Sequence, residues 1–125
     1  MKPEQLEELL RYRIQQAHET LEEAQILLDA SAVRGTVNRA YYAMFYALLA
    51  LLATKQLGTS RHSGALSLFD REFVKPGLFP PEFSRSLHWA FERRQAHDYG
   101  EMIPLDREVP QETLDAAVEF VAAIE

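Results

Sequence analysis

The sequence predicts an all-α protein in which five helices form one bundle. Three observations lead to this prediction. Apolar residues recur at spacings of three and four, no segment alternates with period two for long enough to form a strand, and turn residues separate five apolar segments. Hydrophobic residues make up 47% of the 125 residues and charged residues 26%, which is a globular composition, and we expect one domain over residues 1–125.

The first two helices are predicted to be long. The first runs from Pro3, which suits an opening turn, to about Ser31. Its apolar positions are Leu6, Leu9, Leu10, Ile14, Ala17, Leu21, Ala24 and Leu28. The second runs from about Arg34 to Gln56, where Leu57-Gly58 ends it, and carries an apolar run from residue 40 to 53. This run is shorter than the ~20 residues of a membrane span, so we expect a central helix with neighbours on most sides.

Three further helices complete the predicted bundle. Thr59-Ser60 resembles a cap for a third helix that reaches about Val74. Pro81 opens a fourth helix, which ends between Asp98 and Gly100, and Pro110 begins the last one. The inward positions expected for the fourth helix are Phe83, Leu87, Ala90 and Phe91, and those for the fifth are Leu114, Ala117, Val118, Val121 and Ile124.

Composition and missing motifs exclude several classes of protein. The chain has no cysteine, which excludes disulfides, thiolate zinc sites and cysteine nucleophiles. Its net charge of −6 excludes a general nucleic-acid coat, although a local basic patch remains possible. No Gly-rich phosphate loop or metalloprotease motif is present, so we expect no cofactor. The N-terminus carries no apolar signal core, and we expect a cytoplasmic protein without a membrane span.

The segment from residue 91 to 100 holds the main candidates for chemistry. Arg93 and His97 are four residues apart and share a helix face. The rigid, planar guanidinium of arginine can bind phosphate through two hydrogen bonds, and histidine exchanges protons near pH 7. This pair is therefore the candidate catalytic site. Tyr99 follows at the helix end, where its hydroxyl could reach the same cleft. A capped helix end without chemistry is the alternative interpretation.

Other polar residues favour structural roles when each is considered alone. Arg94 and Asp98 have the spacing of a weak surface ion pair. The four aromatic side chains within residues 41–46 favour core packing, with hydroxyl partners supplied by Asn38, Arg39 or the Arg93 segment.

The remaining histidines point less clearly to a site. His88 and Glu92 would make only half of a metal site, so we expect no metal. His62 begins the third helix, where a capping role is favoured over lining a pocket. His18 lies among glutamates and is expected to be solvated.

Four ordered segments resemble the small HEPN domain proteins (higher eukaryotes and prokaryotes nucleotide-binding). These segments are Asn38-Arg39-Ala40-Tyr41-Tyr42-Ala43-Met44-Phe45, Arg61-His62-Ser63-Gly64, Phe69-x-x-x-Phe73-Val74 and Arg93-x-x-x-x-Asp98-Tyr99-Gly100. The resemblance covers roughly residues 33–124. It implies an up-and-down bundle that dimerises through its core helices, often encoded beside a minimal nucleotidyltransferase as toxin and antitoxin.

The resemblance also suggests roles for individual residues. In nuclease members, an Arg followed after four to six residues by His forms the active site, often with a His-x-Tyr ending such as His97-Asp98-Tyr99. Here only three residues separate Arg93 from His97, and Arg93 fits instead a sibling motif of Arg, spacer and Asp-Tyr-Gly. Arg93 and His97 are kept as the candidate catalytic residues. The candidate binding residues are Asn38, Arg39, His62, Arg94, Asp98 and Tyr99, and Tyr99 is also the candidate for nucleotidylation.

Three functions remain open at the level of sequence. The first is a metal-independent ribonuclease toxin in which His97 acts as general base or acid and Arg93 stabilises charge on phosphorus. The second is a module that binds a nucleotide or a nucleotidyltransferase without cleaving RNA. The third is a structural helical dimer, since the apolar run of residues 40–53 is too long for one helix face of a monomer.

Overall fold

The computed structural model describes residues 2–59, 61–98 and 108–125, with the side chain of His97 outside the description. The described residues form five α-helices and no strand: α1 (Pro3–Asp29), α2 (Val33–Thr54), α3 (His62–Phe69), α4 (Pro81–Asp98) and α5 (Glu108–Ile124). A short π-helix, η1 (Asp70–Val74), continues α3. The predicted all-α fold class is confirmed, and the helix bounds agree with the sequence to within a few residues.

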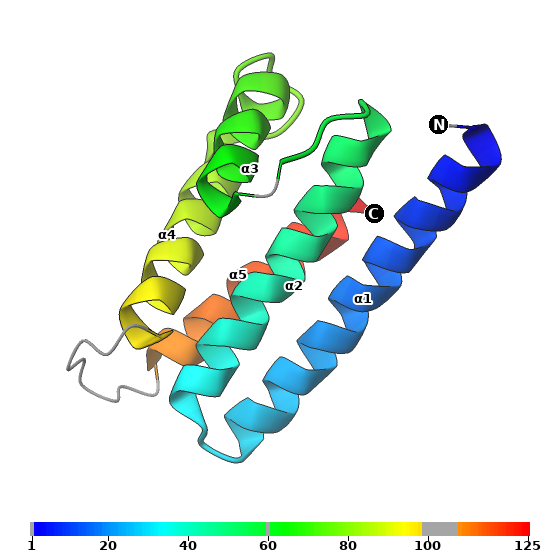
Figure 1. Cartoon of the computed structure of the whole chain (residues 1–125). Coiled ribbons are helices and arrows are strands. Elements are labelled where there is room, and N and C mark those ends of the chain that lie inside the picture. The colour runs from blue at the N-terminus through cyan, green and yellow to red at the C-terminus, as the bar shows by residue number, and fades with distance from the viewer. Residues whose placement is uncertain (1, 60, 99–107) are drawn as a thin grey trace.

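Helix α2 is the central element of the bundle. It packs against α1, α3, α4 and α5. Figure 1 shows α1 and α2 running antiparallel side by side, with α5 behind α2 and with α3 and α4 on the opposite side from α1. The segment that carries Asn38, Tyr41 and Tyr42 is thereby brought against the C-terminal end of α4.

Backbone turns set the ends of α1 and α2. Ser31, with a φ of 60°, reverses the chain between the two helices, and the N–H of Ala32 donates to the carbonyl of Leu27 at 2.8 Å. Helix α2 ends at Thr54 rather than Gln56, because Gln56 itself takes a left-handed φ of 52°. The N–H of Leu57 then donates back to Leu52 at 2.9 Å, so the turn predicted at Leu57-Gly58 begins slightly earlier.

The third helix reaches Val74 as predicted, but its last turn is a π-helix. The N–H of Lys75 donates to the carbonyl of Asp70, five residues back, at 2.8 Å. The Lys55 ammonium, at the end of α2, donates to the carbonyl of Glu72 at 3.0 Å. The N-cap of α3 is Arg61, whose N–H donates to Thr59 Oγ1, whereas Ser60 of the expected cap lies outside the described residues.

The apolar run on α2 is mostly buried within one chain. Four helices surround α2, and the partly exposed residues of this run are Tyr42, Tyr46, Leu49, Leu51 and Ala53. The premise that the run is too long for a monomer is therefore wrong, because a central helix buries several faces rather than one. Among the described residues, no helix is both long and apolar enough to span a bilayer.

One predicted core position on α5 is corrected. Val118 is 49% exposed, whereas Phe120, which the sequence pattern left out, is 1% exposed. The buried arc of α5 extends around the helix because the Phe120 ring also packs between Phe69 and Phe83, at centroid distances of 5.5 and 6.2 Å. Leu114, Ala117 and Val121 are buried as expected.

Candidate functional site

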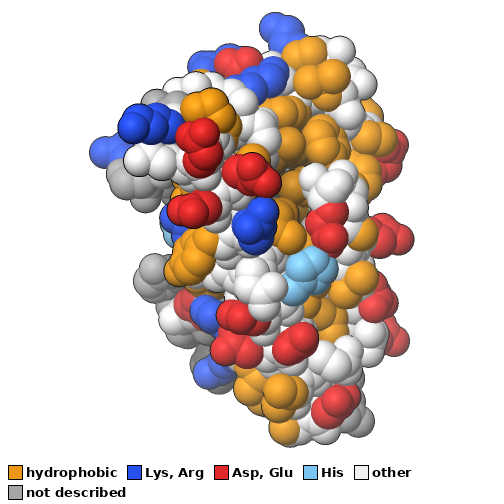
Figure 2. All heavy atoms as spheres, turned by 90° about the vertical axis from the view of Figure 1, so that its right-hand side faces the viewer, with side chains coloured by type: hydrophobic (Ala, Val, Ile, Leu, Met, Phe, Trp, Pro, Cys, Tyr) orange, Lys and Arg blue, Asp and Glu red, His pale blue; other side chains and the backbone are white. Residues whose placement is uncertain are grey.

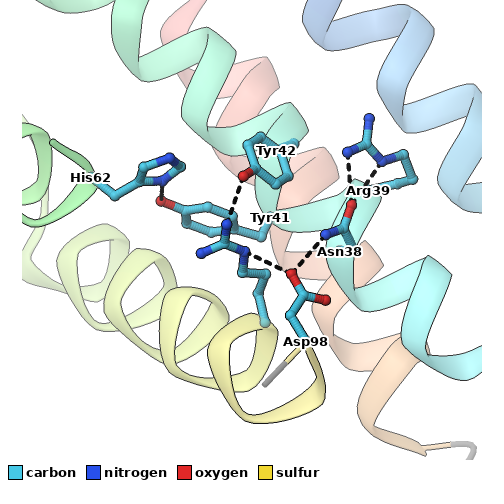
Figure 3. A network of polar contacts seen from close by, with 7 residues as sticks. Asn38, Arg39, Tyr41, Tyr42, His62 and Asp98 are labelled. Atoms are coloured by element: carbon cyan, nitrogen blue, oxygen red, sulfur yellow. Dashed lines mark hydrogen bonds and ion pairs between the residues drawn. The ribbon is translucent and has the colours of Figure 1, made fainter. Parts of the chain in front are cut away.

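A polar network joins the C-terminal end of α4 to α2 (Figure 3). Arg94 donates from Nη2 to the hydroxyl of Tyr42 at 2.6 Å, and its Nε lies 3.0 Å from Oδ2 of Asp98. The Nε–H does not point at that oxygen, so this second contact is an ion pair rather than a hydrogen bond. Asn38 donates from Nδ2 to the same carboxylate oxygen at 3.0 Å. The network fixes the end of α4 against α2.

The Arg94–Asp98 pair is not the weak surface pair that helical spacing suggested. The Arg94 side chain is only 12% exposed and the Asp98 side chain 28%. The guanidinium also lies 5.6 Å from the ring centre of Tyr41 and 5.1 Å from that of Tyr42. Packing against α2 encloses the pair, which spacing along a single helix could not show.

Arg39 lies on the same side of α2 and is oriented by its neighbour in the chain. It donates from Nε and Nη2 to Asn38 Oδ1 at 2.9 and 2.7 Å, while its Nη1 is 3.9 Å from a Glu23 carboxylate on α1. The guanidinium lies 5.0 Å from the Tyr42 ring centre. With 31% of its side chain exposed, Arg39 is more accessible than Arg94.

His62 does not cap α3, contrary to the structural role favoured from sequence. Its Nδ1 lies 2.7 Å from the hydroxyl of Tyr41, and its ring stacks on Phe45 with a centroid distance of 4.1 Å and an angle of 10°. Burial, together with the positive charge of Arg94, lowers the pKa of His62 below its ordinary value. Burial raises the pKa of the Tyr41 hydroxyl, which therefore stays protonated.

The three basic side chains converge on one aromatic ring. Arg39 from α2, Arg94 from α4 and His62 from α3 lie 5.0, 5.1 and 5.6 Å from the ring centre of Tyr42. Sequence reasoning missed Tyr42 as the centre of this site. The available signal was a tyrosine hydroxyl in an apolar run, which requires a polar partner from another helix.

The structure does not bring the predicted catalytic residue Arg93 into this network. Successive residues on a helix point about 100° apart, so Arg93 and Arg94 face different surroundings. The Arg93 guanidinium lies 5.9 Å from the Trp89 ring centre, and its buried Nε has no hydrogen-bond partner among the described residues. His97 lies on the last turn of α4, and its side chain is outside the description, as are Tyr99 and Gly100.

His88 belongs to a separate cluster and not to a metal site with Glu92. Its Nε2 lies 2.8 Å from Oδ2 of Asp70, and Ser84 donates to Oδ1 of the same carboxylate at 2.5 Å. These contacts tie α4 to η1. No group of metal-ligating side chains occurs among the described residues. His18, expected to be solvated, is 45% exposed and lies 2.6 Å from a Glu125 carboxylate oxygen.

The fold and this network define the class of the protein. It is a small helical-bundle protein in which a central helix and the C-terminal end of α4 share an arginine- and tyrosine-rich site. The model of the HEPN domain family matches residues 10–125, so the chain belongs to the HEPN domain family.

Several curated relatives are similar over most of their length. A "UPF0332 protein" of Thermotoga maritima is 40% identical over 119 residues, covering 95% of this chain and 90% of the relative. Two proteins of Methanocaldococcus jannaschii, each named "Putative toxin", are 35% and 33% identical. These two matches cover 79% and 82% of this chain and 71% and 77% of the relatives.

Proposed function

We propose that this protein is the toxin of a toxin–antitoxin pair and acts as a metal-independent endoribonuclease. The observation that carries the proposal is the convergence of Arg39, His62 and Arg94 on Tyr42. Arginines bind phosphate and stack on bases, and tyrosine rings stack on unpaired bases, so the site has the chemistry of an RNA-binding surface. The similarity to relatives named as toxins supports the toxin role.

Cleavage without a metal needs a proton acceptor and a cation near the phosphorus. The 2′-hydroxyl of the ribose attacks the adjacent phosphate while a base removes its proton, and a cation stabilises the charge that develops on the phosphate oxygens. The resemblance makes His97 the general base or acid and Arg93 the cation that stabilises this charge. The network geometry adds Arg39 as a partly exposed, preoriented guanidinium.

The test is cleavage of a labelled single-stranded RNA by the purified protein in the presence of EDTA. We expect cleavage products that carry 2′,3′-cyclic phosphate. Arg39→Met should weaken RNA binding and slow cleavage about tenfold, since one phosphate contact is removed. His97→Ala should stop cleavage without unfolding the protein. Arg85→Met is the control, because Arg85 forms an exposed pair with Glu82 on α4. Intact RNA after prolonged incubation with the wild-type protein would contradict the proposal.

A non-catalytic binding module is the second candidate. The observation that favours it is the pairing of Arg94, 12% exposed, with Asp98, which neutralises the less exposed of the two arginines that contact Tyr42. Such a network holds two helices together and presents Arg39 and Tyr42 for binding alone. Retained binding of a single-stranded oligonucleotide by a protein that leaves RNA intact would support this second function over the nuclease.

We further propose a minimal nucleotidyltransferase as the protein partner, which would transfer AMP to Tyr99. Similarity to the toxin family supports the pairing. An added AMP would place a negative phosphate and a bulky base on the toxin and block RNA. Intact-mass spectrometry after incubation with ATP and the nucleotidyltransferase encoded by the neighbouring gene should show one AMP on the wild-type protein and none on Tyr99→Phe. An adduct that persists in Tyr99→Phe would place the modification elsewhere.

A homodimer remains part of the proposal, on different grounds from the length of the apolar run. Tyr42, Tyr46, Leu49 and Ala53 form a partly exposed stripe on α2 at spacings of four, three and four. Near its end a hollow of about 320 Å³ is lined mainly by apolar residues, among them Leu9 on α1. Figure 2 shows hydrophobic side chains gathered on the upper part of the α1 side of the molecule. Light scattering at micromolar concentration should give twice the 14.3 kDa chain mass.

A further inference from the structure

The two ring nitrogens of His62 lie in different surroundings. Nδ1 lies 2.7 Å from the hydroxyl of Tyr41, whose side chain is fully buried. Nε2 has no hydrogen-bond partner among the described residues and is not a buried unsatisfied atom, so water or a ligand can reach it. In Figure 3 this second nitrogen points away from Tyr41. The ring therefore presents one nitrogen outward and uses the other for support.

Two contacts hold the imidazole in this orientation. Phe45 stacks beneath the ring at 4.1 Å, and Phe45 is itself 8% exposed. The Tyr41 hydroxyl fixes rotation about the side-chain bond, because it accepts from Nδ1–H or donates to Nδ1. Orientation of an imidazole by a hydrogen bond to its inner nitrogen is the arrangement found where histidine transfers protons at its outer nitrogen.

We propose that His62 is the general base of the RNA cleavage reaction and that Tyr41 is its positioning residue. This inference rests on the proposed function and deepens it. Family resemblance left His97 as either base or acid, and the structure places an oriented imidazole on the same site as Arg39, Arg94 and Tyr42. The proposal requires the RNA backbone to bind beside the outward nitrogen of His62.

The charges around His62 suit a base rather than an acid. The titratable groups that face it are Tyr41 and Tyr42 on α2 and Arg94 on α4. No carboxylate among the described residues forms an ion pair with the ring. Burial and Arg94 lower the pKa of His62, so the neutral imidazole with a free lone pair predominates at pH 7. A neutral imidazole accepts the hydroxyl proton, whereas an imidazolium could not.

The proposed step balances without a metal or cofactor. With the ring proton on Nδ1, Nε2 takes the proton from the 2′-hydroxyl as the 2′-oxygen forms a bond to phosphorus. The bond from phosphorus to the 5′-oxygen breaks, and this oxygen takes a proton from His97, which keeps the acid role that the resemblance allows. His62 then releases its proton to the solvent, and His97 regains one from it. The products are a 2′,3′-cyclic phosphate and a 5′-hydroxyl end.

The test compares variants that preserve the inner contact with a matched control. His62→Asn retains a polar atom near the Nδ1 position for Tyr41 but lacks the outer nitrogen, and it should slow RNA cleavage at least ~100-fold with little change in RNA affinity. His88→Asn is the control, since one nitrogen of His88 is likewise held by a neighbour, Asp70, but outside the site. It should cleave at the wild-type rate. Circular dichroism checks that both variants fold. If His62→Asn does not, His62→Gln replaces it, because its amide reaches the outer position but cannot take the proton.

The pH profile separates a chemical role from a structural one. The wild-type rate should fall as the pH drops through the pKa of His62, below its ordinary value of 6.5, and this acidic limb should vanish in His62→Asn. Tyr41→Phe should lower kcat about tenfold and leave KM unchanged, because a positioning contact acts on the chemical step. A His62→Asn protein that cleaves at the wild-type rate with the same limb overturns the inference, while the proposed function stands.

A second measurement needs no cleavage. A single-stranded DNA oligonucleotide lacks the 2′-hydroxyl and serves as an uncleavable probe of the site. Its addition should shift the ring resonances of His62 in NMR spectra and leave those of His88 in place. Shifts at His88 without shifts at His62 would overturn the inference. Intact RNA with the wild-type protein would overturn both the inference and the nuclease function.

Discussion

Two adjacent arginines of α4 should differ sharply in what they contribute to stability. Arg94→Met and Arg93→Met each remove one positive charge and keep an unbranched apolar side chain. The first change breaks the 2.6 Å bond to Tyr42 and the ion pair with Asp98. Among the described residues, the second removes the contact of Arg93 with Trp89, whose ring centre is 5.9 Å away. The difference in stability between the two variants therefore measures what the Arg94 network contributes.

The magnitudes follow from burial and geometry. A hydrogen bond from a charged donor contributes about 1.5–3 kcal/mol. The Arg94–Asp98 ion pair is more enclosed than a surface pair, so it adds about 1 kcal/mol, the upper end of the range for exposed pairs. We therefore expect Arg94→Met to lower the free energy of unfolding by about 2–3 kcal/mol. Loss of the cation–π contact with Trp89 is partly offset by removal of the buried Arg93 Nε, which has no partner among the described residues, so we expect Arg93→Met to cost about 0.5–1 kcal/mol.

Urea denaturation followed by circular dichroism measures both effects. With a slope of about 1.5 kcal/mol per molar urea, Arg94→Met should lower the midpoint by about 1–2 M, and Arg93→Met by about 0.5 M. Arg94→Lys should lie between the two, because a point charge cannot contact Tyr42 and Asp98 in the same geometry. Equal midpoints for Arg94→Met and Arg93→Met would refute the assignment of Arg94 to a structural network.

Three further predictions concern packing, backbone and pH. Phe120→Ala should cost about 3–5 kcal/mol of unfolding free energy, because Phe120 is 1% exposed. Val118→Ala should cost less than about 0.5 kcal/mol, because Val118 is 49% exposed. Similar melting temperatures for the two variants would contradict the placement of Phe120 in the core. Gly77→Ala should cost about 1–2 kcal/mol at its φ of +86°, and Gly58→Ala, with nothing within 4 Å, should be close to neutral in the same denaturation assay. Because folding lowers the pKa of His62, the unfolded chain binds more protons below pH 6.5, so the contribution of His62 reduces stability as pH falls from 6.5 through its folded pKa. His62→Asn should make the pH dependence of the unfolding free energy shallower in this window, and an unchanged dependence would show that His62 titrates as in the unfolded chain.

The sequence by itself determined the fold class, the five helices and most inward positions. Helical periodicity depends on neighbours three and four residues away, so Leu87, Ala90 and Leu114 could be placed in the core without tertiary information. The resemblance carried by residues 38–45 and 93–100 identified the HEPN family, which the family match confirmed. Helix ends shifted slightly because single residues such as Gln56 adopted a left-handed backbone conformation.

Only the tertiary structure decided which side chains share the site. Asn38 and Asp98 are 60 residues apart, and the Tyr41–His62 bond joins two helices across 21 residues, so no local pattern could pair them. Along one helix, Arg94 and Asp98 have only the spacing of a surface pair, and packing against α2 encloses them. Local periodicity fixes which face of a helix is apolar, but the partner of a polar group depends on how the helices pack, and this packing made Tyr42 the centre of the site.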